Sequence, residues 1–359
     1  MDDLTELTAQ LVEIDSINPS LAPGGRGERE IALFVAEWCS QHCLDVELVG
    51  DDRPSVVARR NGSGGGRCLL LNAHLDTVGV SGMEAPHVAR VEDGRLYGRG
   101  AYDMKGALAA ILIAAAGARG LRGDVIVTAV ADEELASIGT EAVLERVRAD
   151  GAIVPEPTDL QVAVAHRGFV GFELETHGVA AHGSRPDLGV DAIVKMGHIL
   201  VALEELDERL TSGPRHPLVG TGSVHASVIE GGQELSSFPA RCVLSGERRT
   251  IPGETAADVE RELRELAGDA TLHVIASRDA YEAPVDHPFV ELVTRIAGAQ
   301  NIIGAPFWTD AALIAGAGIP TVLYGPSGEG AHAEVEWVDL GSLERLQAVI
   351  ERTAAEWCA

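Results

Sequence analysis

The sequence is poor in basic residues. Lys and Arg number 28 among 359 residues, against 55 Asp and Glu, and the formal net charge is −27. Proteins that bind the backbone of nucleic acids need clustered Lys and Arg, so this composition argues against a nucleic-acid partner. Long apolar runs are lacking too. Residues 106–118 are too few to span a bilayer, and residues 311–328 are interrupted by Gly and Pro, so we expect no membrane insertion.

Cysteine is also scarce. The five cysteines are an odd number without paired spacing, which excludes a disulfide framework and favours reduced thiols, as in the cytosol. The first residues, MDDLTELTAQLVEIDS, are acidic and amphipathic and lack the basic start and apolar core of a signal peptide. We therefore expect a cytoplasmic protein.

Two short motifs of other enzyme classes are missing. A nicotinamide dehydrogenase would carry G-x-G-x-x-G after an early strand, and GRGAYD at 98–103 ends differently. A serine hydrolase would carry G-x-S-x-G at a turn between a strand and a helix, and the sequence has none. Both classes are disfavoured.

The order of predicted elements indicates an α/β fold. A chain of 359 residues is long for one core, so we expect two domains. Outside the middle of the chain, strands alternate with helices, which is typical of a mostly parallel, helix-covered sheet. The predicted helices are 4–14, 28–42, 106–118, 139–149, 288–299 and 340–356, and the predicted strands are 55–59, 68–73, 124–131, 152–154 and 321–324.

The middle of the chain has a different pattern. Its predicted elements follow the order β-α-β-β-α-β, which is that of a ferredoxin-like α+β domain. They are strands 168–176, 222–230, 241–249 and 271–276 with helices 190–210 and 256–267. We predict that residues 1–167 and 281–359 form a catalytic domain and that residues 168–280 form a domain inserted into it.

Polar residues follow the predicted strands. His74 and Asp76 are two apart, so both point beyond the carboxyl edge of the sheet, where ligands of α/β proteins bind. If His74 held a metal, Asp76 could accept its other ring N–H. Asp103 lies in a Gly-rich loop before the helix at 106–118, and taken by itself it is better explained as a helix N-cap.

Three further side chains repeat this arrangement. Glu133 and Glu134 follow strand 124–131 and leave it in different directions, so one could bind metal while the other transfers protons. Glu156 lies between two prolines after strand 152–154, and His332 lies in a Gly-rich loop. Taken singly, these residues suit an acidic helix start, a surface turn or a solvated loop. Taken together at one sheet edge, they indicate a metal site.

The donor set indicates the kind of metal. Two imidazoles and three carboxylates suit zinc, manganese or cobalt better than magnesium or calcium. The carboxylates of Asp103, Glu134 and Glu156 carry three negative charges, which two divalent ions and a hydroxide between them would neutralise, whereas one ion would leave excess negative charge. We therefore expect two ions bridged by Asp103.

The sequence resembles the metallopeptidase M20 family, which includes acetylornithine deacetylase, succinyl-diaminopimelate desuccinylase, aminoacylase and glutamate carboxypeptidase. The resemblance spans most of the chain. It rests on HLD (74–76), GRGAYDMKG (98–106), DEE (132–134), PEPT (155–158), GVAAHGSRPDLGVDAI (178–193) and GEGAHAEVEWV (328–338).

The resemblance implies roles for individual residues. It assigns one zinc to His74, Asp103 and Glu156, the other to Asp103, Glu134 and His332, and the role of general base to Glu133. It also implies that the inserted domain is a lid and dimerisation domain of a homodimer, in which His182 reaches the partner's site and stabilises the oxyanion. Arg249 matches an arginine near the substrate carboxylate, and Ser236 stands where members commonly have a substrate-holding asparagine.

The predicted function is therefore hydrolysis of the amide bond of a small N-acyl amino acid by a di-zinc enzyme, with cobalt or manganese as alternative metals. Glu133 would take a proton from the attacking water and return it to the leaving amine. A carboxypeptidase or dipeptidase acting on short peptides is the alternative. A non-catalytic metal-binding scaffold protein is a more distant alternative. A family member that had lost its activity would usually lack a metal ligand or the general base, and none of these is missing here.

Overall fold

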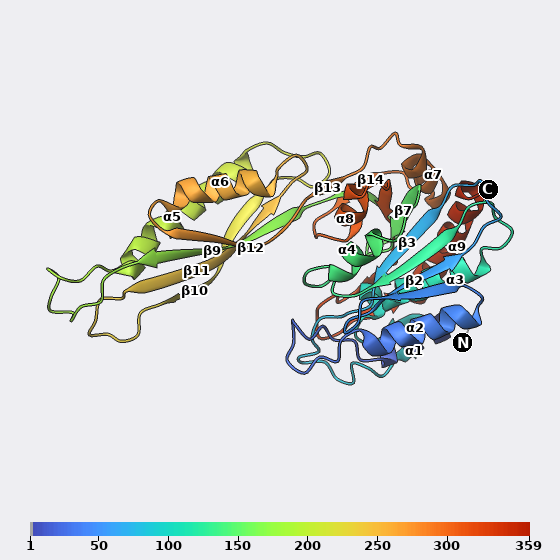
Figure 1. Cartoon of the computed structure of the whole chain (residues 1–359), viewed down its shortest axis with the longest axis horizontal. Coiled ribbons are helices and arrows are strands. Elements are labelled where there is room, and N and C mark those ends of the chain that lie inside the picture. The colour runs from blue at the N-terminus through green and yellow to red at the C-terminus, as the bar shows by residue number, and fades with distance from the viewer. Residues whose placement is uncertain (1–2) are drawn as a thin grey trace. The chain divides into compact units, whose positions relative to one another are not determined.

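The computed structural model describes residues 3–359. The chain divides into two compact units, shown in Figure 1. The first unit comprises the residues up to Val164 together with Ala283–Ile303 and Thr309–Ala359, and the second comprises Ala165–Glu282 with Gly304–Trp308.

The first unit contains a central sheet. Its strands are β1 (Asp45–Val49), β2 (Ser55–Arg60), β3 (Leu69–His74), β6 (Val125–Val130), β7 (Gly151–Val154), β8 (Val162–His166) and β15 (Thr321–Leu323). Their order across the sheet is β1-β2-β6-β3-β7-β15-β8. The four middle strands run parallel, whereas β1, β2 and β8 pair antiparallel with their neighbours. The α/β class is confirmed, and the sheet is mixed because β2 and β8 run antiparallel to their neighbours β6 and β15. The sequence pattern did not reveal β1 and β8.

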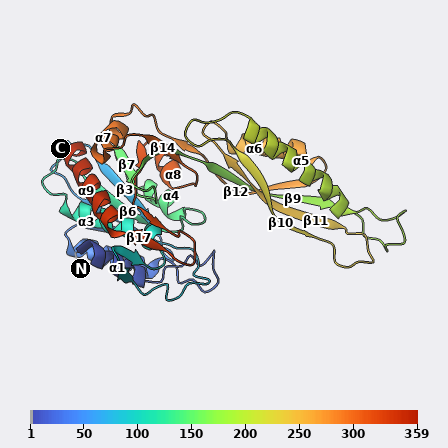
Figure 2. The same ribbon diagram turned by 180° about the vertical axis from the view of Figure 1, so that it is seen from behind.

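Helices cover both faces of this sheet. They are α1 (Asp3–Glu13), α2 (Arg29–Gln41), α3 (Gly106–Gly117), α4 (Ile138–Leu144), α7 (Pro288–Ala297), α8 (Ala311–Gly316) and α9 (Leu340–Trp357). The uncharged helix α3 packs against the sheet and against α1 and α9, which explains why it lacks a polar face. Figures 1 and 2 show α4 and α8 on the face opposite α3 and α9.

A small antiparallel sheet joins two distant segments of the first unit. Its strands, in the order β16-β17-β5-β4, are β16 (Gly328–Glu329), β17 (Trp337–Asp339), β5 (Arg95–Tyr97) and β4 (Arg90–Glu92). Trp337 pairs with Tyr97, so the loop after β5 lies beside the loop between β16 and β17. The first of these loops continues into η1 (Ala101–Lys105), a short turn directly before α3 in which Asp103 and Met104 do not have helical φ/ψ angles.

The second unit has a two-layer α+β architecture. Its sheet has the order β10-β11-β9-β12, formed by β9 (Gly168–His177), β10 (Ser223–Gly231), β11 (Arg241–Thr250) and β12 (Thr271–Arg278). Helices α5 (Ala192–Ser212) and α6 (Ala256–Ala267) cover one face (Figures 1 and 2). The expected β-α-β-β-α-β order is confirmed.

Alternation along β9 explains this packing. Every second side chain of β9 is buried, as expected for a strand with one covered face. Val170, Phe172 and Leu174 face Met196 of α5 and Leu263 of α6 in the core, and burial of each large apolar side chain stabilises the fold by about 1.5–3 kcal/mol.

The second unit also includes residues outside the predicted 168–280. The short strand β13 (Tyr281–Glu282) pairs with the end of β8, and β14 (Ile302–Ala305) also pairs with β8. Trp308 lies edge-on to His166 and Phe169, which explains why Gly304–Trp308 groups with this unit.

Within residues 3–359, no helix combines the length and the apolar character needed to cross a membrane. The cysteines are all free thiols, and Cys39, Cys242 and Cys358 are buried.

Candidate metal centre

Three of the predicted ligands and the predicted base lie at the carboxyl edge of the central sheet, whereas Asp103 and His332 lie in loops next to the small antiparallel sheet. Strands β6, β3 and β7 are parallel neighbours, so their carboxyl ends meet at one edge. His74 is the last residue of β3, Glu133 and Glu134 follow β6, and Glu156 follows β7. Parallel pairing therefore gathers residues that are far apart in sequence.

Two groups of three potential ligands share one carboxylate. One oxygen or nitrogen from each of His74, Asp103 and Glu156 lies within 4.8 Å of the other two, and the same holds for Asp103, Glu134 and His332. The Nε2 atom of His74 is 3.1 Å from Oδ1 of Asp103, and Nε2 of His332 is 3.5 Å from Oδ2. Each oxygen of Asp103 thus faces a different histidine, as a bridging carboxylate requires.

The competing explanations for these side chains do not fit the structure. The start of α3 has no side-chain cap, because Asp103 points to the two histidines instead. Glu156 is 4 % exposed, so it does not lie in a surface turn. His332 is more exposed, but its Nε2 atom is 3.1 Å from Oε2 of Glu134.

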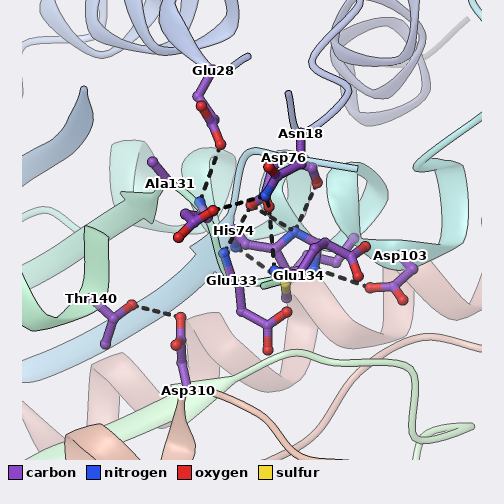
Figure 3. A network of polar contacts seen from close by, with 12 residues as sticks. Asn18, Glu28, His74, Asp76, Asp103, Ala131, Glu133, Glu134, Thr140 and Asp310 are labelled. Atoms are coloured by element: carbon purple, nitrogen blue, oxygen red, sulfur yellow. Dashed lines mark hydrogen bonds and ion pairs between the residues drawn. The ribbon is translucent and has the colours of Figure 1, made fainter. Parts of the chain in front are cut away.

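Asp76 holds the turn that carries the two glutamates (Figure 3). Its carboxylate accepts hydrogen bonds from the backbone N–H groups of Glu133 and Glu134, at 3.1 and 3.3 Å, and from the side-chain amide of Asn18 at 2.8 Å. The predicted contact with His74 is different: Nδ1 of His74 lies 2.9 Å from the backbone carbonyl of Asp76 and 3.7 Å from its carboxylate. Asp76 therefore orients the imidazole through its main chain, because its carboxylate is engaged elsewhere.

A buried polar network supports the same turn from behind. Asn18 donates a second hydrogen bond to the carboxylate of Asp132. The backbone of Asp132 has a positive φ of 68°. Arg53 contacts Asp132 at 2.6 Å and also pairs with the buried Glu28, whose Oε1 atom accepts from the backbone N–H of Asp132 at 3.2 Å. Short Asp side chains tolerate this left-handed backbone when local hydrogen bonds support them.

Both histidines are surrounded by negative charge. Burial lowers the pKa of His74, but the hydrogen bond with Asp103 and the charges of Glu156 and Glu133 together outweigh it and raise this pKa well above the usual value. Hydrogen bonds with Asp103 and Glu134 raise the pKa of His332 to about 10. Burial opposes, but the hydrogen bonds from His332 and His74 prevail and hold the pKa of Asp103 well below its usual range.

The neighbouring acids shift in the opposite direction. Burial, followed by the charge of Glu156, raises the pKa of Glu133 well above its usual value. Burial, followed by the charge of Asp103, does the same for Glu156. Burial also raises the pKa of Asp76 to about 7. The main cause of these shifts is burial, which disfavours the charged form, and neighbouring carboxylates add to it.

A pair of divalent cations fits this site. Two imidazoles and three carboxylates form a donor set typical of zinc, manganese or cobalt. Among the described residues, Oε1 of Glu134 is buried and has no hydrogen-bond partner, although buried oxygens normally have one. A cation held by Glu134, Asp103 and His332 would satisfy this oxygen and offset the crowded negative charge.

Comparison with known proteins agrees with this chemistry. Residues 70–356 match the model of "Peptidase family M20/M25/M40". The chain belongs to this family. An acetylornithine deacetylase of Myxococcus xanthus is 32 % identical over 99 % of this chain and 96 % of its own length, and one of Proteus mirabilis is 29 % identical over 98 % and 96 %. This M20 protein is therefore a metal-dependent hydrolase that acts on amide bonds.

Solved structures show the same fold. An M20 family metallo-carboxypeptidase of Sulfolobus solfataricus superposes with a TM-score of 0.80 at 19 % identity, and each chain covers 99 % of the other. The YXEP protein of Bacillus subtilis, described as a dinuclear metal binding peptidase, gives a TM-score of 0.74 at 18 % identity, covering 99 % of this chain and 97 % of its own. At these identities the likeness extends to the fold alone.

The remaining predicted site residues of the M20 protein lie in the second unit. His182 and Ser236 are both exposed. Their segments are adjacent, since the backbone N–H of Gly183 donates to the carbonyl of Ser236 at 2.6 Å. Nδ1 of His182 contacts the hydroxyl of Ser184 at 2.8 Å. Arg249 is on β11, where its guanidinium pairs with Glu247 at 2.5 Å.

Sequence reasoning missed several buried polar residues of the site. Besides Asn18 and Glu28, the carboxylate of Asp310 is fully buried, and it accepts a hydrogen bond from Thr140 at 2.6 Å (Figure 3). It also accepts one from Asn72 at 3.3 Å. Burial raises the pKa of Asp310 despite these bonds. The position of Asp132 within the DEE motif is the one sequence signal for this network.

Proposed function

We propose that this M20 protein is an N-acyl amino acid deacylase that uses two divalent cations, with zinc as the native metal and cobalt or manganese as working substitutes. The observation that carries the proposal is the pair of ligand groups sharing Asp103, with Glu133 beside them. His74, Asp103 and Glu156 would hold one cation, and Asp103, Glu134 and His332 the other.

Glu133 is proposed as the general base. When bound, the cations would lower the pKa of the attacking water and polarise the scissile carbonyl. The raised pKa of Glu133, caused by burial and by Glu156, suits a group that takes up a proton from water and delivers it to the leaving amine. The backbone of Glu133 is fixed by Asp76, which keeps its side chain at the edge of the site.

The substrate we favour is an acetylated amino acid such as N-acetylornithine. The support is the similarity along nearly the full length to acetylornithine deacetylases. We assign the substrate carboxylate to Arg249, which would exchange its pairing with Glu247 for the ligand, and a polar contact with the substrate to Ser236.

Replacement of Glu133 tests the assignment. Glu133→Gln should retain both metal ions and lose roughly 10²–10⁴-fold in kcat, because the amide cannot accept a proton. Glu145→Gln, which alters an exposed acid of the following segment, is the matched control and should remain active. A kcat for Glu133→Gln near that of the control would reject Glu133 as the base.

A substrate panel tests the specificity. Zinc-loaded protein should hydrolyse N-acetylornithine or other N-acetyl amino acids with a higher kcat/KM than N-succinyl amino acids or dipeptides. A preference for dipeptides would instead identify a peptidase, with the same metal chemistry.

We also propose a cytoplasmic homodimer formed through the second unit, in which His182 supplies an oxyanion contact to the partner's site. His182 is exposed, as a residue that acts on a second chain must be. If it acts between chains, mixing inactive Glu133→Gln and His182→Ala proteins and allowing exchange should restore up to about a quarter of the activity, since one dimer in two is mixed and one of its two sites is intact. No recovery in an exchanging dimer would reject the role.

A further inference from the structure

Glu336 is a buried carboxylate that no role described so far explains. It is 2 % exposed and lies just before β17, four residues after His332. Its backbone carbonyl accepts a hydrogen bond from the backbone N–H of Gly98 at 3.2 Å, which extends the pairing of β17 with β5 toward the metal centre.

The carboxylate of Glu336 accepts four hydrogen bonds from a single loop. Oε1 accepts from the backbone N–H groups of Tyr102 and Asp103, both at 3.0 Å. Oε2 accepts from the backbone N–H of Gly100 at 3.0 Å and from Nη1 of Arg99 at 2.6 Å. One side chain therefore fixes the main chain of the whole approach to Asp103, including the backbone of Asp103 itself.

Arg99 also contacts the main chain of the loop that carries His332. Its guanidinium is buried and its second nitrogen, Nη2, donates to the carbonyls of Gly79 and Ala333, both at 3.0 Å. Ala333 directly follows His332, whose φ is 62°. The Arg99–Glu336 pair thus connects the main chain at Asp103 with the main chain at His332.

We propose that Glu336 is a positioning residue that holds Asp103 and His332 in register with each other, so that the two cations bind as a pair. The inference rests on the proposed function. Glu336 belongs to neither group of candidate ligands, and its carboxylate is engaged by these four hydrogen bonds. It acts because three backbone donors and a guanidinium need two acceptor oxygens that carry full negative charge, and a carboxylate alone supplies them.

Glu336→Gln is the informative substitution. Whichever way the new amide turns, its NH₂ group faces two donors, either Tyr102 N–H and Asp103 N–H or Gly100 N–H and Arg99. Two hydrogen bonds are replaced by repulsion between donors, and the loop that carries Asp103 must move. Changes to groups that orient metal ligands typically weaken metal affinity roughly 10–100-fold, and we expect this for the weaker-bound cation.

The experiment compares metal binding by full-length wild type, Glu336→Gln and Glu334→Gln. Glu334 is an exposed acid two residues away and serves as the matched control. Zn²⁺ is titrated calorimetrically into metal-free protein, well below the unfolding midpoint of each variant. Mn²⁺-loaded samples are then examined by electron paramagnetic resonance. Wild type and Glu334→Gln should bind two ions and give the spectrum of a spin-coupled manganese pair. Glu336→Gln should weaken the second ion and give the six-line spectrum of isolated Mn²⁺.

The outcomes separate this inference from the proposed function. Two tightly bound, spin-coupled ions in folded Glu336→Gln would overturn the inference, even if the variant unfolds at a lower temperature. Fewer than two ions in wild type would instead contradict the two-cation function itself. If Glu336→Gln does not fold, Arg99→Lys is measured in its place. Lysine keeps the positive charge but cannot reach Glu336, Gly79 and Ala333 together, so this variant should also bind the second ion more weakly. Unchanged binding there would reject the role.

Discussion

Asn18 offers the sharpest test of how the site is built. Its side-chain nitrogen donates to the carboxylates of Asp76 and Asp132, at 2.8 and 2.9 Å, and its oxygen accepts from the backbone N–H of Ser20 at 3.0 Å. The substitution Asn18→Leu keeps the approximate volume and removes every one of these contacts. The buried carboxylates of Asp76 and Asp132 would then lose the side-chain amide that donates a hydrogen bond to each of them.

The size of the effect follows from the partners that remain. A hydrogen bond to a charged group contributes about 1.5–3 kcal/mol, so two of them contribute about 3–6 kcal/mol. Asp76 keeps the backbone N–H groups of Glu133 and Glu134, and Asp132 keeps Arg53, which favours the lower end of this range. We expect a loss of about 3–4 kcal/mol, a large share of a typical folding free energy of about 5–15 kcal/mol.

The assay is urea unfolding of metal-free protein, followed by circular dichroism. Asn61→Leu is the matched control, because Asn61 also donates to a carboxylate, that of Asp45, but is exposed. It should change the free energy of unfolding by less than about 1 kcal/mol. If Asn18→Leu cost no more than this control, the network behind Asp76 would not support the site as described.

Two further predictions concern metal and pH. Because the carboxylates of the site repel one another without cations, removal of metal by a chelator should lower the unfolding midpoint. Adding Zn²⁺ at about 100 times its Kd should then raise the free energy of unfolding by about 2.7 kcal/mol, and His332→Ala should reduce this gain. An unchanged midpoint after chelation would contradict the proposed metal site. In the second unit, the Thr255 hydroxyl and the Arg261 guanidinium hold the pKa of Asp258 at about 2, below its usual 3.8. The stabilisation that Asp258 provides is therefore present above about pH 4 and lost as the pH falls toward 2, so Asp258→Asn should have a flatter acid-unfolding profile than wild type, and identical profiles would refute it.

Periodicity predicted the elements that carry the site. The apolar run at 106–118 corresponds to α3, and the buried leucines before His74 correspond to β3. The prediction was less accurate where tertiary pairing decides the structure. The short strands β1 and β8 were not predicted, and β8 pairs with strands far along the chain. The helix predicted at 139–149 ends at Leu144. Such ends depend on local packing that composition does not specify.

The candidate metal ligands were predictable for a different reason. His74 ends β3, Glu134 follows β6 and Glu156 follows β7, and parallel pairing brings these strand ends together without further information. Asp103 and His332 lie in loops next to the small antiparallel sheet, and the pairing of β5 with β17 was not predicted. The supporting network was not predictable, because Asn18 meets Asp76 and Asp132 across 58 and 114 residues, and Glu336 meets Asp103 across 233. Isolated Asn and Glu residues in loops carry no periodic signal that would reveal such partners.

The central claim is that one carboxylate, Asp103, joins two cation sites. Its most direct test is a crystal structure of zinc-loaded protein with anomalous diffraction measured on both sides of the zinc absorption edge. We predict two anomalous peaks, one contacted by His74, Asp103 and Glu156 and the other by Asp103, Glu134 and His332. A single peak, or zinc bound away from Asp103, would contradict the account.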